Sequence, residues 1–144
     1  HEQAIADALD QAGIELVCLA GYLRLLTPFL VRRYARRMLN IHPSLLPAFP
    51  GLDTHARALA AGVKLHGCTV HLVTEAMDEG PILAQAAVPV LPGDTEAGLA
   101  ARVLVQEHLL YPAALARIAA GQPGAAPDAA ASFSNPLPAA PGLF

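Results

Sequence analysis

The stretch "NIHPSLLPAFPG", residues 40–51, sets an amide and an imidazole two residues apart at the end of an apolar run. In a strand, residues i and i+2 point to the same face, so Asn40 and His42 project together before Pro43 ends the pairing. An Asn amide can donate a hydrogen bond to a developing oxyanion, and a His can exchange a proton near neutral pH. A His satisfied by loop backbone and an Asn bracing a turn explain the same spacing equally well.

A carboxylate follows in a second loop. Asp78 lies in "EAMDEGP", directly after a strand-like run, from where it can reach the same crevice as His42. There it could orient the imidazole and stabilise its cationic form. Acidic residues beside Gly and Pro are also common in ordinary turns, and Glu79 shares this ambiguity.

Glu107 lies on the apolar seam of the last predicted helix, four residues after Val103 and three before Leu110. A carboxylate on a buried stripe needs a partner, either an internal cation or a bound polar ligand. The sequence leaves both open.

Other reactive side chains make weaker patterns. A metal site is not expected from His55, His66, Cys68 and His71, because their spacings match no standard zinc arrangement. A nucleophilic triad of Ser44, His42 and Asp78 remains a weak competitor, since the chain has no Gly-x-Ser-x-Gly turn. The chain also lacks a glycine-rich phosphate loop.

The elements that must position these residues follow from hydrophobic periodicity and capping residues. The pattern predicts helices over 1–12, 27–37, 53–62 and 94–120, and strands over 14–20, 38–42, 64–74 and 82–90. Strand 14–20 is apolar almost throughout, which is typical of a strand buried on both faces. We therefore expect an α/β fold with a largely parallel sheet and flanking helices. Ligands bind such sheets at the carboxyl ends of the strands, where Asn40 and His42 lie.

Composition and charge limit the partners and the cellular compartment that we expect for the protein. The 144 residues carry a formal net charge of −3, which gives no electrostatic reason to expect nucleic acid or an anionic membrane as partner. No window reaches the roughly 18 uninterrupted apolar residues of a membrane helix. Cys18 and Cys68 lie in apolar strand-like runs, as buried thiols do, and with no framework spacing they indicate a reducing compartment, hence the cytoplasm.

The chain divides near residue 120. Residues 1–120 carry the predicted elements, whereas 121–144 are rich in Pro and Ala and predict an irregular surface tail. The chain begins at His1 rather than Met, in a helix-like segment with no strand before it. We therefore expect an N-terminal part to be missing.

Three segments carry a resemblance to a known family. "LNIHPSLLPAFPG", with "GYLRLL" before it and "HGCTVHLVTEAMDEGPIL" after it, resembles the glycinamide ribonucleotide formyltransferases among the folate-dependent formyltransferases. The resemblance covers about residues 1–120. It implies a Rossmann-like fold whose C-terminal portion this chain represents. It also implies formyl transfer from 10-formyltetrahydrofolate, as co-substrate and without a metal, to the amino group of glycinamide ribonucleotide in purine biosynthesis.

The resemblance also implies residue roles. The family's catalytic Asn, His and Asp match Asn40, His42 and Asp78. The folate-binding positions match Tyr22, Leu23, Arg24, Leu25 and Leu26, together with the loop residues Asp78, Glu79 and Gly80. The acceptor-binding positions match Ile41, Pro43 and Glu107.

The chain departs from the family where the family's first strands and its phosphate-gripping glycine loop are expected. Formyltetrahydrofolate deformylase shares the catalytic trio, but its motif usually departs at Pro43 to Leu45, where this chain follows the transferases. A methionyl-tRNA formyltransferase is disfavoured because no Lys or Arg follows Arg117. A non-catalytic folate-binding fragment and a Ser44 hydrolase remain as alternatives. The assembly can be a monomer or a homodimer.

Overall fold

A computed structural model describes residues 1–22, 24–121 and 132–133. Its helices are α1 (Glu2–Gln11), α2 (Pro28–Arg33), α3 (Thr54–Ala61) and α4 (Glu96–Ala119). Its strands are β1 (Val17–Leu19), β2 (Met38–His42), β3 (Leu65–Leu72), β4 (Ile82–Pro89) and β5 (Ser132–Phe133). No helix in these ranges is both long and apolar enough to cross a bilayer.

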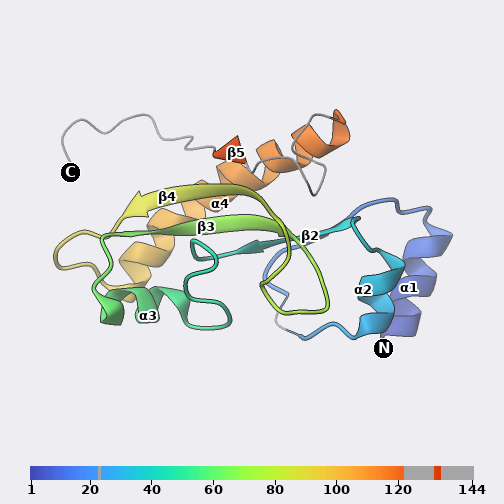
Figure 1. The fold of residues 1–144 in the computed structure, drawn as a ribbon, viewed down its shortest axis with the longest axis horizontal. Coiled ribbons are helices and arrows are strands. Elements are labelled where there is room, and N and C mark those ends of the chain that lie inside the picture. Colours follow the sequence, from blue (N-terminus) through green and yellow to red (C-terminus); the bar gives the residue numbers. More distant parts are fainter. Residues whose placement is uncertain (23, 122–131, 134–144) are drawn as a thin grey trace.

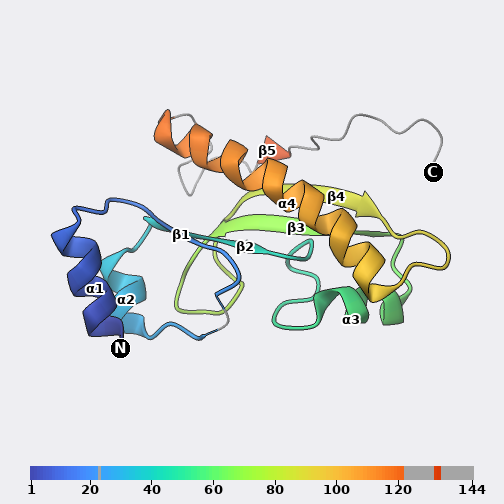
Figure 2. The same ribbon diagram turned by 180° about the vertical axis from the view of Figure 1, so that it is seen from behind.

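The strands form one sheet in the order β1-β2-β3-β4-β5. Helix α4 packs along β3 and β4, α3 lies at one end of α4, and α1 and α2 pair beside the opposite end of the sheet (Figures 1 and 2). The main core lies between α4 and the central strands, where Leu99, Val103 and Leu110 of α4 are buried. A smaller core joins α1 and α2 to the start of β2 through Ala6, Tyr34 and other apolar side chains.

The α/β class with flanking helices is confirmed, but the sheet is mixed rather than largely parallel. β1 runs parallel to β2 through the crossover that contains α2, whereas β3 is antiparallel to both β2 and β4. The loop 73–81 between β3 and β4 is too short for a crossover, so this pair forms a hairpin. The antiparallel register places His71 of β3 opposite Asn40, and Thr69 opposite His42.

The prediction for residues 14–20 was wrong in extent and burial. β1 covers only Val17–Leu19, and Cys18 is exposed rather than buried. Within the described ranges β1 pairs with β2 alone, so it lies at a sheet edge and only part of its surface is covered. Cys68, in contrast, is buried in the main core as predicted.

Residues 121–144, predicted as an irregular tail, are described only in part. Ser132–Phe133 form β5, which pairs in parallel with Ala84 and Gln85 of β4. Residues 122–131 and 134–144 lie outside the described part of the chain, so the prediction stays open for them.

Candidate active site

A cavity of about 1150 Å³ opens at the carboxyl ends of β1 and β2, beneath the middle of α4. Its volume slightly exceeds the range of roughly 300–1,000 Å³ that is typical for one small ligand, which leaves room for two small molecules side by side. One wall is apolar and is formed by Leu19, Tyr22, Leu25, Leu26, Val73 and Met77. The opposite end is polar and is formed by Thr54, His55, Glu96, Glu107 and His108.

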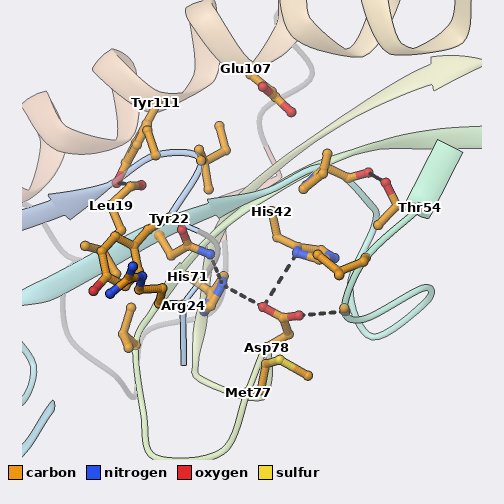
Figure 3. Close-up of a pocket in the computed structure, with 18 of the residues that line it drawn as sticks. Leu19, Tyr22, Arg24, His42, Thr54, His71, Met77, Asp78, Glu107 and Tyr111 are labelled. Carbon is orange, nitrogen blue, oxygen red and sulfur yellow. Dashed lines mark hydrogen bonds and ion pairs between the residues drawn. The ribbon is translucent and has the colours of Figure 1, made fainter. Parts of the chain in front are cut away.

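Asn40 and His42 both line this cavity, as their spacing predicts. Strand β2 ends at His42 because Pro43 has no N–H to continue the ladder. His42 Nε2 lies 2.9 Å from the carbonyl oxygen of Phe49, so this nitrogen donates and carries a proton. Nδ1 faces the carboxylate of Asp78 at 3.5 Å (Figure 3). Both ring nitrogens of His42 therefore face acceptor oxygens.

Asp78 links three segments around the cavity. Its Oδ1 faces His42, and its Oδ2 accepts a hydrogen bond of 2.8 Å from the backbone N–H of Gly51. The Asp78 backbone has φ 56°, in the left-handed region that Asp tolerates better than most residues. This bend turns the carboxylate toward His42, so the sequence prediction for Asp78 agrees with the geometry.

A buried polar network fixes the loop that follows His42. Thr69 Oγ1 donates to the carbonyl of Ser44 at 2.7 Å and accepts from the N–H of Leu46 at 3.0 Å. Gln85 donates to both the Leu46 carbonyl and Thr69 Oγ1. The same loop presents the Phe49 carbonyl to His42, so the network holds one of the two acceptors that orient the imidazole.

Glu107 projects from α4 toward the cavity (Figure 3). Burial raises the pKa of its carboxyl group. Among the described residues Glu107 has no hydrogen bond or ion pair. Positive charge on His108 and His42 acts in the opposite direction to burial and lowers its pKa. In the described part of the chain no internal cation forms an ion pair with Glu107, so of the two kinds of partner a bound polar ligand remains.

The predicted donor-side and acceptor-side residues fall into three groups. Those that line the cavity are Tyr22, Arg24, Leu25, Leu26, Asp78, Ile41, Pro43 and Glu107. Glu79 and Gly80 do not line it, because the chain turns away after Asp78 and Gly80 packs against β3. A Cβ on Gly80 would lie 1.7 Å from the carbonyl oxygen of Leu72. Leu23 lies outside the described residues.

The competing nucleophile fails on geometry. Ser44 is fully buried, does not line the cavity and donates its hydroxyl to the carbonyl of Ala48 at 2.6 Å, so the triad reading was wrong. Cys68 lies in the core, where burial raises its thiol pKa to about 12. Over residues 1–22, 24–121 and 132–133, no group of three His, Cys, Asp or Glu side chains could hold a metal ion.

Sequence reasoning missed His71 as a site residue. Its Nε2 lies 3.3 Å from Asn40 Nδ2 and 3.8 Å from Asp78 Oδ1. The sequence contains "VHLV" in this strand, but only the antiparallel register with β2 shows that this imidazole faces Asn40.

The formyl transferase family model matches residues 1–115. The chain belongs to the formyl transferase family. It is 46% identical over 122 residues to phosphoribosylglycinamide formyltransferase of Escherichia coli K12, covering 85% of this chain and 58% of that protein. The resemblance seen in the sequence motifs is thereby confirmed.

Solved structures of formyltransferases and of a related deformylase have folds similar to that of this chain. The phosphoribosylglycinamide formyltransferase of Brucella melitensis is 66% identical with a TM-score of 0.79, over 85% of this chain and 62% of that one. A formyltetrahydrofolate deformylase from Pseudomonas syringae is 34% identical with a TM-score of 0.75, over 78% of this chain and 38% of that one. The chain spans less than two thirds of the length of these relatives, and the transferases are the more similar to it.

Proposed function

We propose that the protein of this chain transfers a formyl group from 10-formyltetrahydrofolate to the amino group of glycinamide ribonucleotide, a step of purine biosynthesis. The observation that carries the proposal is the convergence of Asn40, His42 and Asp78 on one cavity large enough for two small molecules. Relatives named for this reaction cover most of the chain, at 46% identity for the Escherichia coli enzyme.

The site suits the attack of an amine on a formyl carbon. As the C–N bond forms, the formyl C=O double bond opens and negative charge gathers on its oxygen. The amide N–H of Asn40 and the charge of the His42 imidazolium can stabilise that oxygen. Because His42 Nε2 is already bonded to the Phe49 carbonyl, Nδ1 is the nitrogen that can share its proton with the substrate.

Proton balance assigns a role to Asp78. The attacking amine loses one proton, and the folate nitrogen that leaves the tetrahedral carbon gains one. Asp78 keeps His42 in its charged form through Oδ1, and its carboxylate can relay the proton between the two nitrogens. No covalent bond to the protein is required, which agrees with Ser44 being buried away from the cavity.

The two ends of the cavity suit the two substrates. A flat folate ring with polar edges fits the apolar wall of Leu19, Leu25 and Leu26. Leu25 is 76% exposed, so it has surface to bury against such a ring. Glu107 at the other end can accept hydrogen bonds from the hydroxyl or amino groups of the acceptor.

Hydrolysis of the same donor is the second candidate, because the deformylase of Pseudomonas syringae shares the fold. Water as acceptor would need no binding group beyond the reacting trio. The unpaired carboxylate of Glu107 instead gives the cavity a place for a larger polar acceptor, which favours transfer.

The test is tetrahydrofolate release from 10-formyltetrahydrofolate, with and without glycinamide ribonucleotide, using the protein at its natural length. Release that requires the acceptor is expected. Release at the same rate without it would establish the hydrolase, and donor binding without release would establish a binding protein.

We also propose a cytoplasmic location. Cys18 and Cys68 are both free thiols, which suits a reducing compartment. Recovery of the protein in the soluble cytoplasmic fraction is expected, and recovery from an oxidising compartment would contradict it.

A further inference from the structure

A third imidazole lies beside the reacting trio. His71 is on β3, directly opposite Asn40 in the antiparallel register, and it is only 3% exposed. Its Nδ1 lies 3.0 Å from the carbonyl oxygen of Leu72, and its Nε2 lies 3.3 Å from Asn40 Nδ2. The ring therefore spans from a fixed backbone carbonyl to the amide that faces the cavity.

The two hydrogen-bond partners of His71 fit one protonation state. A carbonyl oxygen only accepts, so Nδ1 must carry a proton to bond Leu72. An amide nitrogen only donates, so Nε2 must offer a lone pair to Asn40. The neutral ring with its proton on Nδ1 meets both conditions. Burial also lowers the pKa of His71, which favours this neutral form.

We propose that His71 is a positioning residue that acts through Asn40 and fixes which way its amide points. This inference rests on the proposed function. By accepting one N–H of Asn40, His71 holds the amide nitrogen toward β3 and leaves the second N–H to donate to the formyl oxygen. Without this acceptor the amide could turn and present its oxygen, which repels a developing oxyanion instead of stabilising it.

Protonation of His71 would reverse the arrangement. A proton on Nε2 would place two donors face to face, and Asn40 would have to turn its oxygen toward the ring. The groups that face this nitrogen are the Asp78 carboxylate, 3.8 Å away, and the charge of His42, which act in opposite directions. The Leu72 carbonyl faces the other nitrogen. The rate should therefore fall on the acid side as His71 gains its proton.

Two substitutions separate positioning from packing. In the natural-length protein, His71→Phe keeps an aromatic ring but removes the acceptor. His71→Gln keeps a side-chain oxygen that can accept from Asn40. We expect kcat to fall about tenfold or more in His71→Phe, with the donor KM changed less than about twofold. His71→Gln should recover most of the lost kcat. Because Gln does not titrate, the decrease in rate at acid pH that depends on His71 should be absent in His71→Gln. Thermal unfolding of each variant shows that the protein compared is folded.

A double-mutant comparison tests whether His71 acts through Asn40. Asn40→Ala combined with His71→Phe should lose no more activity than Asn40→Ala alone, because the residue being positioned is gone. Losses that multiply, or a His71→Phe variant as active as the wild type, would overturn the proposal.

A readout that needs no activity keeps the proposal separate from the proposed function. Nitrogen-15 NMR of the imidazoles in the resting protein should show His71 neutral with its proton on Nδ1, and the Asn40 side-chain amide signals should shift in His71→Phe. A proton on Nε2 at neutral pH would overturn the assignment. If the wild type transfers no formyl group, the proposed function fails, and the NMR result still decides the tautomer.

Discussion

Replacing Asp78 by Asn removes a charge while changing little else. Asn tolerates the left-handed backbone at this position, and its side-chain oxygen can still accept from the N–H of Gly51. The loop should therefore keep its shape. What is lost is the negative charge 3.5 Å from His42 Nδ1.

The size of the effect follows from that separation. Two unit charges about 4 Å apart attract by roughly 4 kcal/mol at an effective dielectric constant of about 20. If most of this attraction supports the charged imidazole in the transition state, its loss lowers kcat by about 10²- to 10³-fold. The donor and acceptor KM should change far less, because neither binding wall is altered.

The assay is steady-state formyl transfer by the natural-length protein, with Asp94→Asn as the matched control. Asp94 forms an ion pair with Arg102 at 2.8 Å, away from the cavity, and that interaction lowers the carboxyl pKa to about 2. The control should lose stability but retain kcat. A folded Asp78→Asn protein with wild-type kcat would show that the carboxylate does not support His42.

Three further outcomes follow from the geometry. Glu107→Gln should raise the KM for the acceptor about tenfold and leave the donor KM nearly unchanged. Steady-state kinetics with each substrate varied in turn measure both values, and a rise in the donor KM instead would contradict the prediction. Thr69→Val should lower the free energy of unfolding by about 2–4 kcal/mol, because it leaves the Leu46 N–H and the Ser44 carbonyl buried without their partner; a urea midpoint equal to wild type would refute this. Burial lowers the pKa of His66 from 6.5 to about 4. Between these two pH values the unfolded chain binds a proton at His66 and the folded protein does not. Stability should fall as the pH drops from about 6.5 toward about 4 and level off below, and urea midpoints should show a shallower decline in His66→Gln.

The sequence predicted the part of the site that one strand carries. Strand β2 was placed at residues 38–42 because Pro43 ends it, and the i, i+2 rule put Asn40 and His42 on one face. Glu107 was identified because a carboxylate is out of place on an apolar helix seam, and the structure directs it into the cavity.

What the sequence could not predict depends on contacts between distant segments. The place of His71 beside Asn40 follows from the register of β2 against β3, which no local pattern encodes. The short loop before β4 could have predicted the hairpin, and hence the mixed sheet, but the apolar runs alone suggested parallel strands. An apolar run likewise does not reveal that β1 pairs with β2 alone in the described part of the chain, which is why Cys18 was wrongly expected to be buried.

The loop after Asp78 differs from what the resemblance implied. The resemblance placed Glu79 and Gly80 with Asp78 among the folate-binding positions, whereas in this structure only Asp78 lines the cavity, and the role of the other two in folate binding stays a prediction. The left-handed backbone of Asp78 turns its side chain inward while the next residues leave toward β4, where Gly80 must lack a Cβ to pass the Leu72 carbonyl. Such a turn is visible only once the backbone angles are known.

The most direct test of the central claim is to follow the formyl carbon itself. Carbon-13 NMR with a donor labelled at the formyl position, glycinamide ribonucleotide and the natural-length protein would show where that carbon goes. We predict that it appears as the formamide of the acceptor, and that Asn40→Ala slows its arrival without redirecting it. Appearance of the label as free formate in the presence of the acceptor would contradict the account.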